Sequence, residues 1–148
     1  MGKYQSTKLF DGFSVAIRQH KAQHSHCCLN HGYSIYFVVT FEADSLDEMN
    51  WIADFGCFKR NGLKDWLADM FDHTQLIEKD DPMLDYFKMM EVERICNLRI
   101  LDAMGCESLA KLVSDKFNDV FSKTEGGRIR IVKVECFEHA KNSGIYME

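Results

Sequence analysis

The sequence predicts an α+β domain in which helices pack on one face of an antiparallel sheet. Segments with alternating apolar residues lie toward both ends of the chain, and segments with apolar residues at helical spacing lie between them. Strands that are separated in this way from a run of helices are typical of an α+β architecture. The length of 148 residues suits one domain with one hydrophobic core.

Two strands are expected in the first third of the chain. The first follows a turn-like Asp11-Gly12 and covers residues 13–17 (FSVAI), where apolar side chains alternate. The second covers residues 33–44 (YSIYFVVTFEAD), which are rich in aromatic and β-branched side chains. We expect the two strands to pair antiparallel, with residues 20–30 as the connecting loop.

Three helices are expected next. Residues 54–72 contain apolar side chains at helical spacing, with Asp54 as the N-cap. Residues 79–95 predict a shorter helix with Pro82 near its first turn. Residues 106–121 (CESLAKLVSDKFNDVF) repeat the amphipathic pattern and predict the last helix.

The C-terminal quarter predicts two more strands. A Gly-Gly turn precedes a β-branched run, and residues 143–148 (SGIYME) form a short final strand. Alternation divides the longer strand into one face with Arg130, Val132, Val134 and Cys136 and another with Ile129, Ile131, Lys133, Glu135 and Phe137. A sheet this small leaves open edges, so self-association through them is expected.

Composition narrows the classes of partner. The net charge is −5 and no basic stripe is present, which argues against nucleic acid. No apolar run approaches the ~18 residues of a membrane span, and the N-terminus shows no signal-peptide core, so no membrane partner is expected. Six cysteines without such a signal indicate free thiols and a cytoplasmic protein.

Residues 24–34 (HSHCCLNHGYS) concentrate reactive side chains in one loop. His24, His26 and His31 surround Cys27, whose pKa they can lower, as a base or nucleophile requires. A thiolate with several histidines can also bind zinc, although this spacing matches no standard zinc finger. A polar loop without chemistry is the third interpretation.

Three further positions have a functional and a structural interpretation. Asp72-His73 places a carboxylate beside an imidazole, which is a recurring way to orient a base, but the pair can also simply end a helix. Glu107 starts a helix, where the dipole favours an acid in any case. Glu135 lies within a strand and can face solvent beside Lys133.

At these residues the chain resembles the 6-pyruvoyl tetrahydropterin synthase and 6-carboxytetrahydropterin synthase family. The family's motifs are matched in order by FSVAI, CCLNHGYS, NWIADFGCFK, FDHTQL, CESLAKLV and IVKVECFEHAKNSGIY. The resemblance covers nearly the whole chain, as a single domain over residues 1–148. Within it, residues 78–104 look like an insertion between the two main helices.

The resemblance implies a fold and a reaction. The fold is the tunnelling fold, a four-stranded antiparallel sheet with two main helices on one face, assembled into a multimeric barrel with its pocket between subunits. The reaction is that of a lyase that removes triphosphate from a dihydroneopterin triphosphate-type pterin. The implied partner is therefore a pterin- or purine-like small molecule.

The resemblance also implies roles for single residues. Cys27 falls on the catalytic cysteine, and Asp72 and His73 fall on the proton-relay pair. Glu135 falls on the pterin anchor, and Glu107 falls on the acid at the helix start. A carboxylate suits the anchor because it can accept two hydrogen bonds from the amino-pyrimidinone edge of a pterin.

The family's zinc motif of three histidines is altered in this chain. The first position reads Ile17, or Ala16 if the loop shifts, and the third reads Tyr33, so His31 alone is kept. One imidazole cannot hold Zn²⁺ in the usual three-ligand open site. If the metal is lost, the chain is a non-catalytic pterin- or purine-binding member of the family.

The alternative is that the loop rebuilds the zinc site. His31 would then supply one ligand from its strand, and His24 and His26, with His20 as a further candidate, would supply the others. Zinc needs neutral imidazoles.

Overall fold

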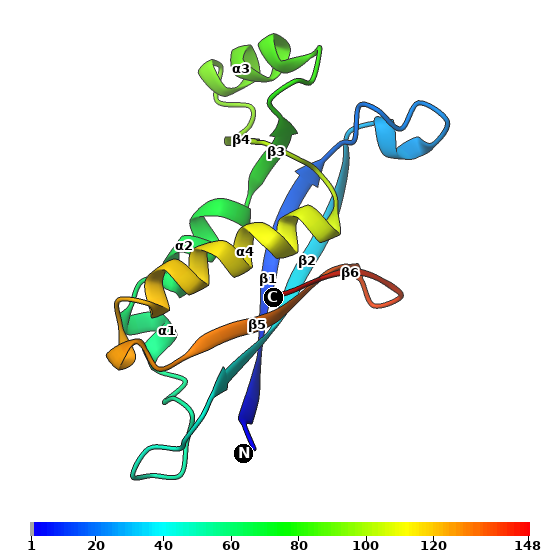
Figure 1. Ribbon diagram of the computed structural model, residues 1–148. Helices are drawn as coiled ribbons and strands as arrows, with labels where there is room; N and C mark the ends of the chain where they lie inside the picture. The colour runs from blue at the N-terminus through cyan, green and yellow to red at the C-terminus, as the bar shows by residue number, and fades with distance from the viewer. Residues whose placement is uncertain (1) are drawn as a thin grey trace.

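The computed structural model describes residues 2–148 and shows a six-stranded sheet with helices packed on one face (Figure 1). The strand order is β4-β3-β1-β2-β5-β6. In chain order, the elements are β1 (Tyr4–Ile17), η1 (His26–Cys28), β2 (His31–Ala43), α1 (Cys57–Arg60), α2 (Leu63–Phe71), β3 (Thr74–Glu78), α3 (Leu84–Val92), β4 (Leu98–Leu101), α4 (Cys106–Phe121), η2 (Glu125–Gly127), β5 (Arg130–His139) and β6 (Asn142–Met147).

The core lies between the helices and the antiparallel strands β1, β2 and β5. The predicted face of β2 is confirmed, because its alternate apolar residues are buried against the helices: Ile35, Phe37, Val39 and Phe41. The predicted last helix is confirmed as α4, which covers this face with Leu109, Val113, Phe117 and Phe121. The α+β class with helices on one face is therefore established.

The turn expected at Asp11-Gly12 is instead a bulge within β1, which begins at Tyr4. β1 contains one residue more than β2 between Phe10 and Phe13, and Gly12 adopts a φ of +87°, which favours glycine. The extra residue lets both phenylalanines face the core, since strict alternation would have turned one of them outward.

The expected division of β5 into two faces is wrong at its start. The pairing with β2 shifts by one residue opposite Thr40 and Phe41. As a result, Ile131 and Val134 are both buried, while Val132 between them is only half-buried. From Val134 to Phe137 the strand alternates as expected.

The helix expected over residues 54–72 is divided into α1 and α2. Gly62 adopts the left-handed conformation with φ 82°, and the Asn61 side chain accepts a hydrogen bond from the amide of Leu63, where α2 begins. Asp54 is not the N-cap of one long helix. Its carboxylate instead accepts from the amide of Gly56 in the turn before α1.

Two strands that the sequence analysis missed make the sheet mixed and larger than the expected four strands. β3 pairs parallel with the last three residues of β1, and β4 pairs parallel with β3. Between them α3 projects away from the main body (Figure 1) over a small second core of Ile77, Phe87 and Leu98. Residues 78–104, which include α3 and β4, remain our predicted insertion.

The sheet has long unpaired edges. β3 covers β1 only from Val15 to Ile17, so most of β1 is open on that side. β6 forms the opposite edge. Separately, none of the helices within residues 2–148 has the length and apolar character that crossing a membrane requires.

Candidate functional site

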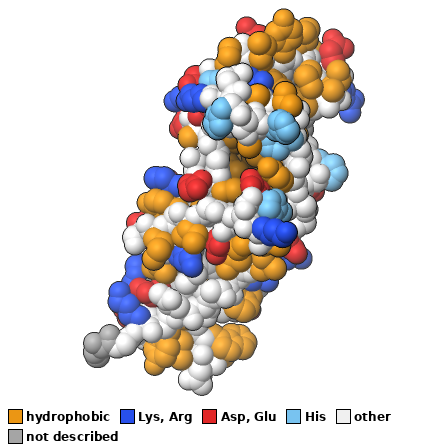
Figure 2. Space-filling view, turned by 90° about the vertical axis from the view of Figure 1, so that its right-hand side faces the viewer, with side chains coloured by type: hydrophobic (Ala, Val, Ile, Leu, Met, Phe, Trp, Pro, Cys, Tyr) orange, Lys and Arg blue, Asp and Glu red, His pale blue; other side chains and the backbone are white. Residues whose placement is uncertain are grey.

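The loop between β1 and β2 borders a hollow of about 370 Å³ at one end of the sheet. Figure 2 shows histidine side chains gathered around a hollowed apolar area on this face of the molecule. The lining residues are His26, Cys27, Leu29, Asn30, His31 and Tyr33. Cys27 lies exposed in η1, where Ser25 caps the turn by accepting a hydrogen bond from the amide of Cys27 at 3.1 Å.

The strand geometry of β2 turns His31 and Tyr33 to the same side. Their ring centroids are 5.0 Å apart with an interplanar angle of 88°. The register pairs Ile17 with His31, so Ile17 rather than Ala16 stands opposite the retained histidine. Nδ1 of His31 lies 2.6 Å from the carbonyl oxygen of Leu29, which fixes the ring and leaves Nε2 free.

Tyr33 faces the carboxylate of Glu138, a residue that the sequence analysis missed. Burial raises the pKa of Tyr33, and the negative charge of Glu138 raises it further, so the hydroxyl stays protonated and can donate to that carboxylate. One oxygen of Glu138 also accepts a hydrogen bond from the side-chain amide of Asn142 at 3.1 Å. Glu138 lies at an irregularity in the pairing with β6, between Phe137 and His139, so strand alternation alone gave no signal of the face that it occupies.

The first turn of α4 brings Glu107 to the same end of the sheet. A Cβ atom at Gly144 of β6 would lie 2.6 Å from the amide nitrogen of Glu107, so only glycine permits this close approach. Next to it, contact with the Cys136 thiol lowers the pKa of Cys106, while the charges of Glu138 and Glu107 act in the opposite direction. Both carboxylates therefore lie around Cys106.

Glu135 is separated from these residues by the sheet itself. Its neighbours Val134 and Cys136 point into the core, so its side chain leaves the opposite face. There the Ser143 hydroxyl donates a 2.6 Å hydrogen bond to its carboxylate. The expected pterin anchor and the predicted catalytic Cys27 thus do not meet within one chain.

Asp72 and His73 form the expected pair, but at a different hollow. Oδ1 of Asp72 lies 3.0 Å from the amide nitrogen of Ser14 and 3.0 Å from Nδ1 of His73. The Ser14 amide, with a contribution from His73, lowers the pKa of Asp72 and keeps it ionised. His73 is largely exposed and borders a hollow that it shares with Glu91, Arg94, Ile95, Cys96 and Asn97.

The residues at the family's zinc position do not fit a three-histidine site. Ile17 and Tyr33 provide no imidazole beside His31. In this structure the ring nitrogens of His24, His26 and His31 do not all lie within 4.8 Å of one another, so the rebuilt zinc site stays a prediction. Within residues 2–148, the one group of three metal-ligating side chains whose ligand atoms lie within 4.8 Å of one another is His20, Glu78 and Asp80.

A larger hollow of about 580 Å³ lies elsewhere, between the start of β1 and residues 46–55. Apolar and aromatic side chains such as Trp51 and Phe55 dominate its lining, and Asp54 is its one carboxylate. Because it contains no cysteine or histidine, it lacks the groups of the predicted reaction, and we place the candidate site at the Cys27 hollow instead.

Comparison with known proteins identifies the family to which the chain is similar. A family model described as 6-pyruvoyl tetrahydropterin synthase matches residues 7–148. The 6-carboxy-5,6,7,8-tetrahydropterin synthase of Rickettsia felis is 22% identical over 97 residues, which are 66% of this chain and 67% of that protein. The enzyme of the same name from Rickettsia typhi is 33% identical over 55 residues, 37% of this chain and 39% of that protein.

Solved structures show the same fold at low identity. An uncharacterized protein of Wolinella succinogenes superposes with a TM-score of 0.81 at 16% identity, covering 100% of this chain and 99% of that one. The 6-pyruvoyl tetrahydropterin synthase of Caenorhabditis elegans superposes with a TM-score of 0.68 at 19% identity, covering 100% and 97%.

Proposed function

Because the chain belongs to the 6-pyruvoyl tetrahydropterin synthase family, we propose that it is a lyase acting on a dihydroneopterin triphosphate-type pterin. The observation that carries this proposal is the position of Glu138. Its carboxylate faces Tyr33, which lines the same hollow as the exposed thiol of Cys27. A group that can anchor the heterocycle and a group that can remove a proton thus lie at one end of the sheet.

Glu138, rather than Glu135, serves as the pterin anchor in this proposal. A carboxylate can accept two hydrogen bonds from the amino-pyrimidinone edge of a pterin, and this bidentate pair is strong because one partner is charged. The Tyr33 hydroxyl lies near this carboxylate on one side, and the side-chain amide of Asn142 donates a hydrogen bond to it from another. Glu107, at the first turn of α4, adds a second carboxylate nearby.

Cys27 acts as the base in the proposed reaction. It takes a proton from a carbon of the pterin side chain, and the electron pair of that C–H bond forms a double bond to the neighbouring carbon. The carbon–oxygen bond on that neighbour breaks, and triphosphate leaves with the electron pair of that bond. His73, oriented by Asp72 through Nδ1, then relays protons during remodelling of the side chain. Because Cys27 and His73 face different hollows, a second copy of the chain must supply one of them, as in a pocket between subunits.

A non-catalytic pterin- or purine-binding role is the second candidate. It is favoured by Ile17 and Tyr33, which occupy two of the family's three zinc positions and leave His31 alone. No step of the proposed reaction is therefore assigned to zinc at that position.

Neopterin binding tests the anchor. Glu138→Gln replaces an acceptor oxygen with an amide donor that faces donors of the ligand, so calorimetry should show affinity weakened by about tenfold or more. Glu135→Gln is the matched control on the opposite face and should bind as the wild type does. A folded Glu138→Gln protein with unchanged affinity would remove Glu138 from the site.

Turnover separates the two candidate functions. Release of triphosphate from 7,8-dihydroneopterin triphosphate by the wild type, and its loss in Cys27→Ala, would support the lyase. Binding of the pterin without any release would identify a binding protein instead.

A further inference from the structure

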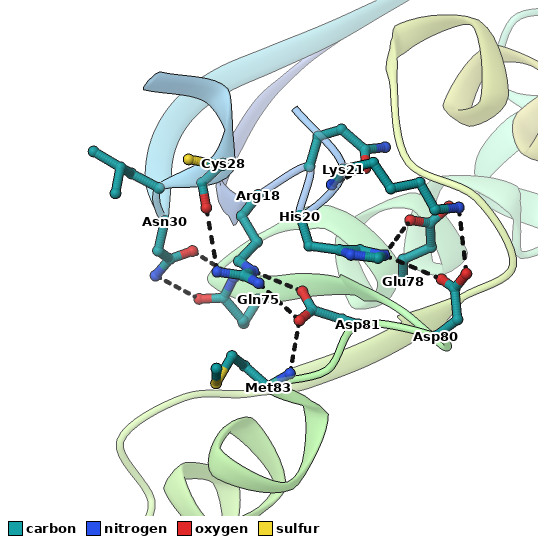
Figure 3. A network of polar contacts seen from close by, with 12 residues as sticks. Arg18, His20, Lys21, Cys28, Asn30, Gln75, Glu78, Asp80, Asp81 and Met83 are labelled. Atoms are coloured by element: carbon teal, nitrogen blue, oxygen red, sulfur yellow. Dashed lines mark hydrogen bonds and ion pairs between the residues drawn. The ribbon is translucent and has the colours of Figure 1, made fainter. Parts of the chain in front are cut away.

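A second cluster of ligating side chains lies where the loop after β1 meets the end of β3 (Figure 3). Nε2 of His20 lies 3.2 Å from Oε2 of Glu78 and 3.3 Å from Oδ1 of Asp80. The three side chains come from two segments that are far apart in the sequence and converge on one point, as the close-up shows. Neither the proposed lyase reaction nor the pterin anchor uses them.

Glu78 has an oxygen that the protein does not satisfy. Its side chain is 6% exposed, and its Oε2 atom accepts no hydrogen bond. The nearest donor is Nε2 of His20, which can carry only one proton and also lies against Asp80. A buried carboxylate oxygen without a donor is costly, so this atom points to a missing positive partner.

We propose that His20, Glu78 and Asp80 bind a divalent first-row transition cation such as Zn²⁺. Ligands about 2.0–2.1 Å from a tetrahedral zinc lie roughly 3.3 Å from one another, which agrees with the 3.2 Å and 3.3 Å separations from Nε2 of His20. One imidazole and two carboxylates favour zinc, cobalt or manganese over magnesium and calcium, which prefer oxygen ligands alone. Asp80 is 55% exposed, so a fourth position can open to water.

Lys21 pairs with the same two carboxylates that such a cation would bind. Its Nζ atom lies 3.5 Å from Oε1 of Glu78 and 3.3 Å from Oδ2 of Asp80, and its side chain is 58% exposed. With His20 neutral, the group of Lys21, Glu78 and Asp80 has a net charge of −1. An incoming cation would take the place of Lys21, whose flexible side chain can move into solvent.

A neighbouring ion pair holds the two segments in position. Arg18 donates to both oxygens of Asp81, from Nε at 2.6 Å and from Nη2 at 2.9 Å. It also donates to the carbonyl oxygen of Cys28, so the loop and the end of β3 are fixed together (Figure 3). The ligands are therefore preorganised before a metal arrives.

Metal titration tests this site without reference to enzyme activity. Chelator-treated, dialysed full-length protein is titrated with Zn²⁺ by calorimetry and with Co²⁺ by visible absorption. We expect one saturable site in the wild type. Glu78→Gln and His20→Ala should bind the metal at least roughly tenfold more weakly. Lys21→Met should bind it more tightly, because the competing lysine charge is gone.

Asp102→Asn is the matched control. Asp102 is an exposed acid that pairs with Lys79 beside the cluster, and its loss should leave metal binding unchanged. Lys21→Met covers the case in which Glu78→Gln fails to fold. Absence of saturable uptake by both the wild type and Lys21→Met, or equal losses in Glu78→Gln and Asp102→Asn, would show a closed ion-pair network and overturn the proposal.

Discussion

Tyr33 stands where the resemblance led us to expect a zinc ligand, and it lies beside a carboxylate instead. Its ring stands at right angles to that of His31, and its hydroxyl faces Glu138. The expected imidazole is therefore a protonated hydroxyl in this chain. The side chain at position 33 points to the same face as His31 but carries a hydroxyl instead of an imidazole.

The register of β1 and β2 indicates which substitutions would create a three-histidine zinc site. Ile17→His together with Tyr33→His should restore three imidazoles with His31 on one face, and such a set binds zinc. In a Glu78→Gln background, which disables the other candidate cation site, elemental analysis should find one zinc per chain more than in that background alone.

The matched control shifts one histidine to the other face. Ala16→His with Tyr33→His introduces the same number of imidazoles, but residue 16 points away from His31. This variant should gain no zinc. Equal zinc contents in the two double variants would mean that the register does not determine the site.

At the scale of elements, Glu42 links three strands. Its carboxylate accepts from Arg130 of β5 at 2.8 Å and from Gln5 of β1 at 3.0 Å, and Lys3 lies 3.1 Å away. The hydrogen bond from Arg130, followed by those from Gln5 and Lys3, lowers the pKa of Glu42 to about 2 from its usual 4.5.

The lowered pKa predicts how stability responds to acid. Because the folded state holds the proton less tightly than the unfolded state, this stabilisation is complete above pH 4.5 and is lost as pH falls toward 2. Glu42→Gln should unfold at a lower temperature than the wild type at pH 6, and the difference in midpoint should shrink toward pH 2. Glu48→Gln, at an exposed position, should show no such trend.

Some elements could be predicted from sequence and others could not, for physical reasons. β2 and α4 were predicted because each buries one face and leaves regular periodicity. β3 reads TQLIE and is buried along its whole length, so it shows no alternation. The start of β1 was missed because a bulge breaks its period.

The candidate site was predicted only where local spacing matched a motif. Cys27, Asp72 and His73 were predicted in this way, and the structure shows the last two in contact. Glu138 was missed because which side of the sheet a carboxylate occupies depends on pairing, and the motif pointed to Glu135. Glu78 was missed because nothing in a short buried strand reveals which distant loop will face it.

At the scale of the molecule, the open edges and the divided site suggest the same assembly. β1 is uncovered along most of its length and β6 forms the other edge, so copies can join sheet to sheet. Light scattering at micromolar concentration should give a mass well above 17.2 kDa. A clean monomer would contradict the shared pocket.

Mixing two inactive variants tests the shared pocket directly. Cys27→Ala and His73→Ala each remove one half of the proposed machinery, from hollows that lie apart in one chain. Co-refolded in equal amounts, they should recover about a quarter of wild-type triphosphate release, because random assembly pairs intact halves at that frequency. If assembled mixtures recover no triphosphate release, Cys27 and His73 either act within one protomer or take no part in the reaction.

The order of the elements along the chain also affects biosynthesis. β1, β2 and β3 leave the ribosome first, whereas α4 and β5, which complete the core, lie in the last third of the sequence. Until they emerge, the aromatic face of β2 is only partly covered, by Phe58 of α1 and Phe71 of α2, and it lacks the apolar side chains of α4. The incomplete chain therefore exposes apolar surface of the kind that chaperones bind. A message truncated before α4 would yield a product prone to aggregate rather than a smaller domain.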